Sequence, residues 1–326
     1  MTAITNLIAR VCYSNTANQP ILLLGHGWNG DVTSFGDTTL KRLASYGLFV
    51  VSVGLRGRNS ATGANDCSAR EIYDYYDALT TIRSRFSRWV SPTKAAFFGL
   101  SAGGGNAFAV ASKFPDTFNV ITEYFGMSDY GRDATDGWYQ NGGTGYPAAV
   151  ATAIGDTPTN VPDKYYARDA TVAITNFSGG FLYLYHDKQD TIVPWVHSNR
   201  IKTILDTASM TNYAASFTDT GDPSRWLHGY DNVIPEATWC PKIIEQDVWT
   251  IPESGTITVI GYIVTKRFTI WLNTGLDAAA TVVYDTAAGT YTVTPLTSNA
   301  VVAVTITQGA LTASGNTDGE TLFTVA

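Results

Sequence analysis

Short apolar runs alternate with amphipathic stretches from the first residues to about residue 245. Runs of this kind predict buried strands, here Ile21–Gly27, Leu48–Gly54, Lys94–Gly99, Phe118–Gly126 and Gly180–His186. Between residues 68 and 86, apolar side chains recur every three or four positions, which predicts a helix. Strands that alternate with helices need crossover connections, so the pattern predicts an α/β fold with a mostly parallel sheet flanked by helices.

One connection between predicted strands is too long for a simple loop. It covers residues 127–178 and is rich in glycine, aspartate and aromatic residues. Connections of this length in compact domains usually carry a function. We interpret it as a cap-like insertion over the functional site, and an insertion without a functional role is the alternative.

The hydrophobic pattern changes near Trp249. From there on, segments rich in Thr and Val alternate with period two and are separated by Gly, Asn and Asp turns. Arg267 is the last Lys or Arg of the chain. We therefore predict two domains, an α/β domain over residues 1–248 and a small all-β, sandwich-like accessory module over residues 249–326.

Composition narrows the choice of partners. The 326 residues carry a net charge of −7, with 15% charged and 44% hydrophobic residues, so the chain can bury a core and nucleic acid is an unfavourable partner. No apolar run is long enough to span a membrane, and no early segment has the pattern of a signal peptide. The low charge, with 8 Trp and 18 Tyr, is typical of proteins outside the cell, such as a secreted enzyme or a phage virion component.

The segment from Gly99 to Gly103 reads Gly-Leu-Ser-Ala-Gly and lies between a predicted strand and a helical stretch. In that context the pattern Gly-x-Ser-x-Gly predicts a nucleophile elbow, a sharp turn that exposes the serine hydroxyl. Small neighbours are needed because the backbone passes too close for larger side chains. We expect Ser101 to be the catalytic nucleophile.

A serine hydroxyl becomes a good nucleophile when a base takes its proton. His228 follows every strand predicted for the first domain, which is where this topology places the base; a surface histidine is the alternative. The base needs an acid to orient it, and Asp190 at the tip of the loop after a strand is our first choice, with Asp187 as the alternative.

The oxyanion hole needs two backbone N–H groups. We expect those of Ala102, directly after the nucleophile, and of Trp28, in the loop after the first predicted strand. His26 in that loop is more typical of a structural residue than of a second base. We predict no cofactor and no metal, because His186 and Asp187 are followed by no third ligand at suitable spacing. The three cysteines, Cys12, Cys67 and Cys240, leave a disulfide and three free thiols both open.

Four segments, in this order and spacing, resemble the α/β-hydrolase superfamily: HGW (26–28), GLSAGGG (99–105), HDKQDTIVP (186–194) and HGY (228–230). They are most similar to the dienelactone hydrolase and prolyl-oligopeptidase-like branch, which includes many acetyl esterases, and residues 55–63 also resemble its Arg-Gly loop. The resemblance covers about Leu7 to Val248 and implies a serine hydrolase. Two departures stand out: His-Asp replaces the usual His-Gly before the acid, and the C-terminal module is not part of the hydrolase pattern. Peptidases of this branch generally carry an N-terminal propeller that this sequence lacks, which favours an esterase over a peptidase.

Together these features predict a serine carboxylic-ester hydrolase that acts through an acyl-enzyme. An acylated carbohydrate or surface glycan is the candidate substrate, because sugar rings stack on aromatic faces such as those of Trp138, Tyr139 and Tyr146 in the insertion. The alternative is that these rings form the core of the insertion. Two other functions stay open, a serine peptidase or amidase with the same triad and a catalytically silent binding or virion structural protein.

Overall fold

The computed structural model describes residues 7–57, 61–219, 228, 236–273, 276–297 and 301–325. Within these ranges, seven strands form a first sheet in the order β1-β3-β2-β4-β5-β6-β7. The antiparallel edge strand β1 (Ala9–Cys12) pairs with β3 (Phe49–Val53), and every other pair in this sheet is parallel. The remaining strands are β2 (Gln19–Gly25), β4 (Val90–Leu100), β5 (Val120–Tyr124), β6 (Phe181–Asp187) and β7 (Tyr213–Thr218).

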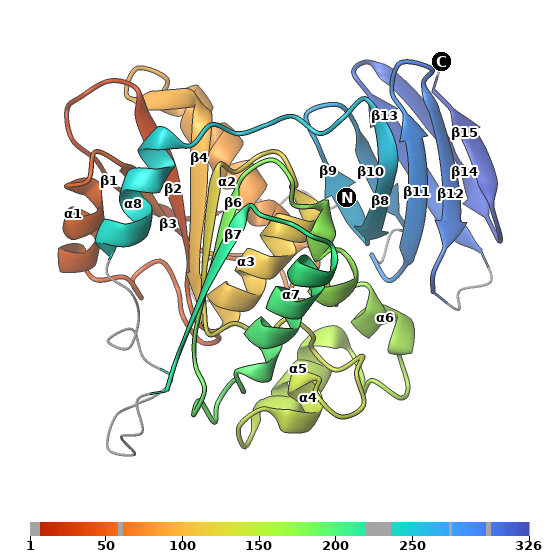
Figure 1. Ribbon diagram of the computed structural model, residues 1–326, viewed down its shortest axis with the longest axis horizontal. Coiled ribbons are helices and arrows are strands. Elements are labelled where there is room, and N and C mark those ends of the chain that lie inside the picture. Colours follow the sequence, from red (N-terminus) through yellow and green to blue (C-terminus); the bar gives the residue numbers. More distant parts are fainter. Residues whose placement is uncertain are drawn as a thin grey trace.

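Helices cover both faces of this sheet (Figure 1). One face packs against α2 (Glu71–Arg85), α3 (Ala102–Lys113) and α7 (Val196–Thr207), and the other against α1 (Asp37–Ala44) and α8 (Glu236–Glu245). Side chains that alternate along a strand enter the two cores in turn: Leu23 lies in the first core and Leu22 and Leu24 in the second. The predicted α/β-hydrolase architecture is therefore confirmed.

The strands predicted from apolar runs correspond to β2 to β6, and the helix predicted over residues 68–86 corresponds to α2. The edge strand β1 was absent from the prediction. Its four residues alternate between exposed and half-buried positions, so they lack the continuous apolar run that marks the central strands.

Residues 127–178, between β5 and β6, contain three short α-helices and two 3₁₀ turns. The first two of these helices lie below α7 in Figure 1. These elements are α4 (Trp138–Asn141), α5 (Tyr146–Ile154), α6 (Pro162–Tyr166), η1 (Ala170–Val172) and η2 (Ile174–Asn176). Apolar side chains of the three α-helices, with Met127 and Tyr130, form a separate small core that also includes Ala102 at the start of α3. The insertion is thus packed directly onto the elbow.

A second, entirely antiparallel sheet follows in the described residues, in the order β14-β13-β10-β9-β8-β11-β12-β15. It folds over its own core into a sandwich-like module, and Thr317 of β14 hydrogen-bonds Thr321 of β15 at 2.8 Å between hydroxyl oxygens. The strands are β8 (Ser254–Ile260), β9 (Tyr262–Val264), β10 (Thr269–Leu272), β11 (Ala279–Asp285), β12 (Thr290–Pro295), β13 (Val302–Gln308), β14 (Leu311–Thr317) and β15 (Thr321–Thr324). The boundary between residues 248 and 249 stays a proposal.

The two sheets share a hydrophobic core. Tyr262, Val264 and Leu276 of the second sheet and its loops belong to the same buried cluster as the apolar residues of α2 and α3. The buried Lys113 of α3 donates from Nζ to the carbonyl of Ile260, with Nζ 4.7 Å from the centre of the Tyr262 ring. The Lys113 ammonium is therefore paired within the seam, beside the apolar contacts.

Candidate active site

Ser101 occupies the turn between β4 and α3. Its backbone angles, φ 57° and ψ −121°, lie outside the regions that a non-glycine residue usually adopts. The Ser101 N–H donates to the carbonyl of Tyr124 on the neighbouring strand at 2.9 Å. A strained backbone that is fixed by its surroundings is typical of a functional residue, and here it has the strand-to-helix context of a nucleophile elbow.

The glycines beside Ser101 are required by close backbone contact. A Cβ added to Gly99 would lie 1.8 Å from the carbonyl oxygen of Gly103, and one added to Gly103 would lie 2.0 Å from that of Gly25. Both distances are far below van der Waals contact. The small residues of the motif thus allow β2, β4 and the start of α3 to meet at one point.

The structure brings together the three side chains that the sequence predicted for catalysis. The distance from His228 Nε2 to Ser101 Oγ is 2.8 Å, and the distance from His228 Nδ1 to Asp190 Oδ2 is 2.6 Å. His228 is 7% exposed, and the Phe125 ring packs against its imidazole at 4.5 Å between centroids. An imidazole placed between a hydroxyl and a carboxylate can take a proton from the first while the second stabilises its charged form.

The Asp190 carboxylate is held by its own loop. Its Oδ1 accepts from the N–H groups of Ile192 (2.8 Å) and Val193 (3.1 Å). Burial raises the pKa of Asp190, but hydrogen bonds from His186 and His228 outweigh it and hold the pKa below its ordinary value. The carboxyl is therefore ionised at neutral pH, as the partner of a catalytic imidazole must be.

Asp187, the alternative acid, makes other contacts. Its Oδ1 accepts from the N–H of Gln189 at 2.9 Å, and its Oδ2 accepts from the hydroxyl of Thr218 at 3.0 Å. These bonds tie the end of β6 to β7. Of the two aspartates, Asp190 is the one that contacts His228.

A second polar set, absent from the sequence prediction, continues from Asp190 into the interior. His186 Nε2 lies 2.7 Å from the carbonyl oxygen of Val193 and 3.4 Å from Asp190 Oδ2. His186 Nδ1 lies 2.7 Å from Ser198 Oγ, which is 3.2 Å from each carboxyl oxygen of Glu123. The sequence carries one signal for this set, a glutamate inside the otherwise apolar run of β5.

Burial acts on the protonation of this second set. Glu123 is fully buried, and burial raises its pKa well above the usual value, which favours the protonated carboxyl. The Ser198 hydroxyl lies between the Glu123 carboxyl and His186 Nδ1, so a protonated Glu123 that donates to Ser198 lets Ser198 donate to His186 Nδ1. In that arrangement His186 carries its proton on Nε2, which points towards Val193 and Asp190.

The residues expected to form the oxyanion hole lie on both sides of the nucleophile. Ala102 is the first residue of α3, where helical N–H groups have no partner within the helix. The loop that contains Trp28 also lies close, because a Cβ added to Gly27 would be 3.8 Å from Ser101 Cβ. His26 is buried, and its Nδ1 lies 2.9 Å from the carbonyl oxygen of Gly27, which suits a structural role.

A cavity of about 240 Å³ lies next to the elbow. Its lining combines apolar groups with hydroxyls and comes from the β2 loop, the start of α1 and the residue before the nucleophile: His26, Gly27, Ser34, Phe35, Thr39 and Leu100. A cavity smaller than about 300 Å³ suits a small group rather than a drug-sized ligand. The cavity, which Leu100 just before Ser101 helps to line, can therefore receive a short acyl or alcohol group.

The aromatic residues of the insertion have different environments. Trp138 is 1% exposed and donates from Nε1 to the carbonyl of Ile192 at 2.9 Å. Tyr146 and Trp28 are half-buried and pack against the Trp138 ring, at 4.7 and 5.3 Å between centroids. Tyr139 packs on Tyr165 within the insertion. Trp138 thus supports two more accessible rings, and substrate stacking by Trp138, Tyr139 and Tyr146 stays a prediction.

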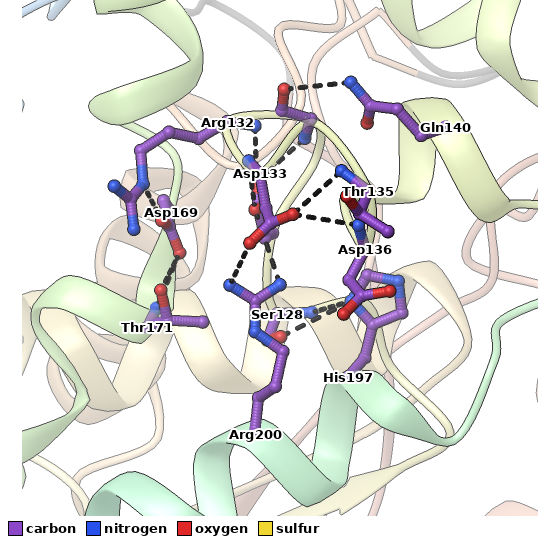
Figure 2. Close-up of polar contacts among 12 residues, drawn as sticks. Ser128, Arg132, Asp133, Thr135, Asp136, Gln140, Asp169, Thr171, His197 and Arg200 are labelled. Atoms are coloured by element: carbon purple, nitrogen blue, oxygen red, sulfur yellow. Dashed lines mark hydrogen bonds and ion pairs between the residues drawn. The ribbon is translucent and has the colours of Figure 1, made fainter.

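Charged contacts join the insertion to α7, the helix that follows the Asp190 loop (Figure 2). Arg200 of α7 reaches Asp133, at 3.3 Å between Nη2 and Oδ2. His197 Nδ1 accepts from the N–H of Ser128 at 3.3 Å, and its Nε2 lies 3.3 Å from Asn141 Oδ1. Burial lowers the pKa of His197 to about 3, so it is a neutral link between the insertion and α7.

All three cysteines, Cys12, Cys67 and Cys240, are free. Within the described ranges, no three His, Cys, Asp or Glu side chains are grouped so that they could hold a metal ion, and no helix is long and apolar enough to cross a membrane. Residues 58–60 of the predicted Arg-Gly loop, and Gly229 and Tyr230 of the fourth motif, lie outside the described residues.

Comparison with known structures supports the fold. The acylaminoacyl peptidase of Pyrococcus horikoshii matches with 17% identity and a TM-score of 0.55 over 66% of this chain and 34% of that chain. Dipeptidyl peptidase 4 of Porphyromonas gingivalis matches with 16% identity and a TM-score of 0.56, over 74% of this chain and 33% of that chain. Esterase B of Lactobacillus rhamnosis matches with 14% identity and a TM-score of 0.54, over 73% of this chain and 78% of that chain. The chain thus spans about a third of the length of the two peptidases, and no curated protein matches it.

A family model adds what the structural likeness leaves open. The model, described as X-Pro dipeptidyl-peptidase (S15 family), matches residues 6–230, which include all the motifs named above. The predicted resemblance to the α/β-hydrolase superfamily is therefore confirmed. The chain belongs to the X-Pro dipeptidyl-peptidase family S15, a family of serine hydrolases in the prolyl-oligopeptidase-like branch of the α/β-hydrolase superfamily.

Proposed function

We propose that this protein is a serine carboxylic-ester hydrolase in which Ser101 is the nucleophile, His228 the general base and Asp190 the acid that orients it. The observation that carries the proposal is the continuous pair of hydrogen bonds from Ser101 through His228 to Asp190, 2.8 and 2.6 Å long, on a strained elbow. This arrangement meets the geometric requirement for nucleophilic catalysis by serine.

Acylation begins when the Ser101 oxygen attacks the ester carbonyl while His228 Nε2 takes the hydroxyl proton. Asp190 stabilises the imidazolium through Nδ1. The tetrahedral oxyanion accepts hydrogen bonds from the backbone N–H groups of Ala102 and Trp28. The intermediate collapses when the bond to the alcohol oxygen breaks and His228 donates its proton to that oxygen, which leaves the acyl group on Ser101.

Deacylation repeats these steps with water. His228 removes a proton from a water molecule as its oxygen attacks the acyl carbonyl, and the same two N–H groups hold the second oxyanion. The Ser101 oxygen then leaves with the proton from His228, and the carboxylic acid is released. One ester bond and one water molecule are consumed, and the enzyme is restored.

The substrate that we propose is a short acyl ester, such as an acetyl group, on a carbohydrate. The cavity of about 240 Å³ has a lining of apolar and hydroxyl groups, which suits a small uncharged group. The half-buried rings of Trp28 and Tyr146 lie beside the elbow region and offer aromatic faces to a sugar. In this proposal residues 127–178 act as the cap that carries one of these rings.

A peptidase is the second candidate, favoured by the family model and by the peptidases among the similar structures. The same triad cleaves an amide when His228 protonates the leaving amine. The two candidates differ in the leaving group on the acyl carbon, which is an alcohol oxygen in an ester and an amine nitrogen in an amide. Rates on ester and amide substrates therefore distinguish them.

The deciding experiment measures kcat/KM for p-nitrophenyl acetate, p-nitrophenyl octanoate, an acetylated oligosaccharide and Ala-Pro-p-nitroanilide. We expect the acetyl esters to be turned over, the octanoate at least tenfold more slowly, and the anilide not above the rate of the Ser101→Ala variant. Faster turnover of the anilide than of the esters would make the protein a peptidase. Absence of Ser101 labelling by a fluorophosphonate probe would instead make it a silent binding or structural protein.

A further inference from the structure

A second cavity, of about 170 Å³, lies at the seam between the first sheet's helices and the second sheet, away from Ser101. Tyr76 and Arg83 of α2 form one wall, and Thr265 and Lys266, in the turn between β9 and β10, form the opposite wall. Pro92, Thr93 and Thr117 complete the lining. The cavity is thus built by residues from both parts of the chain.

Positive charge gathers in this cavity. Arg83 and Lys266 both line it, and the Arg83 Nε is buried without a hydrogen-bond partner in the described part of the chain. Burial lowers the pKa of Arg83, and burial together with the charge of Arg83 lowers that of Lys266. Two cations that repel each other at a partly buried seam are stabilised by a bound anion.

The nearest carboxylate is already engaged. Asp116 is fully buried, and its oxygens accept from the backbone N–H groups of Ile251 (3.2 Å) and Lys266 (3.0 Å). The charge of Asp116 favours the protonated form of Lys266, but the carboxylate is used to hold the seam through these N–H groups. It leaves the guanidinium of Arg83 available to a ligand in the cavity.

We propose that this cavity binds a small oxyanion, a carboxylate or a phosphate group, between Arg83 and Lys266. A guanidinium presents a planar fork of donors that matches the oxygens of either group, and an ammonium adds a compact second charge. The buried Thr117 lies in the same lining, where its hydroxyl favours a polar ligand. The size of the cavity suits an ion or a single acidic sugar.

Arg83 comes from a helix of the first sheet and Lys266 from a turn of the second sheet, so an anion bound between them joins the two parts of the chain. A ligand that binds only the folded protein raises its melting temperature, and the rise grows with the ratio of free ligand to Kd. The proposal therefore predicts stabilisation by the anion, and it does not depend on the proposed esterase activity, since none of the lining residues belongs to the triad.

The test measures the melting temperature of the full chain with phosphate, glucuronate, glucose and sodium chloride, the last at equal ionic strength. We expect millimolar phosphate or glucuronate to raise it above the chloride control, with glucose inactive. A glucuronate affinity at least tenfold above that of phosphate assigns the site to a sugar carboxylate, and the reverse assigns it to phosphate.

The variants Arg83→Gln and Lys266→Gln should each weaken the binding of the active anion at least tenfold, and the exposed Arg85→Gln on the same helix should leave it unchanged. Lys266 is exposed, so its variant tests the site even where Arg83→Gln fails to fold. Melting temperatures that rise no more than in chloride, or a rise that persists in both Gln variants, would overturn the proposal.

Discussion

Two sets of serine, histidine and carboxylate side chains meet at Asp190, one open and one buried. In the open set, Ser101 lies 2.8 Å from His228; in the buried set, Ser198 lies 2.7 Å from His186. The contact distances are nearly the same. The surroundings differ, because Ser101 sits on a strained turn beside a cavity, whereas Ser198 lies in the first turns of α7 with no exposed surface.

The comparison shows that a serine–histidine hydrogen bond alone does not make a nucleophile. Ser101 has neighbouring helix-start N–H groups, a cavity is lined by the residue before it, and its base is held by an ionised carboxylate. Ser198 lies between the buried Glu123 carboxyl and the His186 imidazole, so its hydroxyl is used in linking these two groups. We therefore expect the two sets to respond differently to the same substitutions.

The largest expected difference is between the two serines. Ser101→Ala should lower kcat for p-nitrophenyl acetate on the order of 10⁴-fold or more with an unchanged circular dichroism spectrum, because it removes the attacking oxygen. Ser198→Ala removes a hydrogen bond that acts at a distance and should cost less than about a hundredfold. Equal losses in the two variants, measured under saturating substrate, would contradict the roles assigned to them.

The next effect separates the two aspartates. Asp190→Asn should lower kcat by about 10³-fold to 10⁴-fold, because the amide cannot stabilise the His228 imidazolium and favours the wrong tautomer. Asp187→Asn serves as the matched control and should change kcat by less than about tenfold, since Asp187 bonds to Gln189 and Thr218. A severe loss in the control with normal folding would assign the acid role to Asp187.

A smaller effect tests the protonation of the buried set. Glu123→Gln keeps a donor for Ser198 and an acceptor for the Gly126 N–H, so stability and kcat should stay close to those of the parent protein. Glu123→Ala leaves both groups unpartnered and should lower the free energy of unfolding by about 1–3 kcal/mol, with a drop in kcat. Urea unfolding and initial rates measure both. If the Gln variant is as impaired as the Ala variant, Glu123 acts as an anion.

The smallest effect is a pH dependence that arises at His197, the neighbour of Ser198. Its folded-state pKa of about 3 lies below the unfolded value of 6.5, so its contribution to stability is present above pH 6.5 and is lost as the pH falls towards 3. His197→Asn keeps an acceptor for the Ser128 N–H without this titration. Between pH 6 and 4 its free energy of unfolding should fall less steeply, by up to about 1.4 kcal/mol per pH unit. Identical slopes would show that His197 is protonated in the folded protein.

Local sequence patterns predicted much of the fold. The apolar runs marked β2 to β6 because strands buried on both faces are apolar at most positions. The elbow was predicted from five residues because a side chain at its glycines would collide with nearby backbone, and this constraint is local to the turn. The choice of Asp190 over Asp187 followed from its place at the loop tip, and it is the aspartate that contacts His228.

Contacts between distant segments were beyond the reach of the sequence. Glu123, His186 and Ser198 lie on β5, β6 and α7, and only the packing of these elements brings them into line. The period-two pattern of the second sheet showed which residues alternate, but not that the face with Tyr262 and Trp271 would pack on Tyr73 of α2. Charge pairs such as Arg200 with Asp133 depend on the same long-range arrangement.

The shared core of Tyr262, Val264 and Leu276 with the helices of the first sheet limits how this protein can be divided. Removal of the residues after 248 would expose the Phe114 ring at the end of α3, which now packs on Tyr262. It would also leave the buried ammonium of Lys113 without the Ile260 carbonyl to which it donates. We expect such a fragment to aggregate through the exposed apolar surface, so its activity would not measure that of an independent hydrolase domain. The C-terminal strands are therefore not an independent unit for domain exchange. A chimera with a related protein would need both sides of this shared core, the helix side and the sheet side, from the same parent.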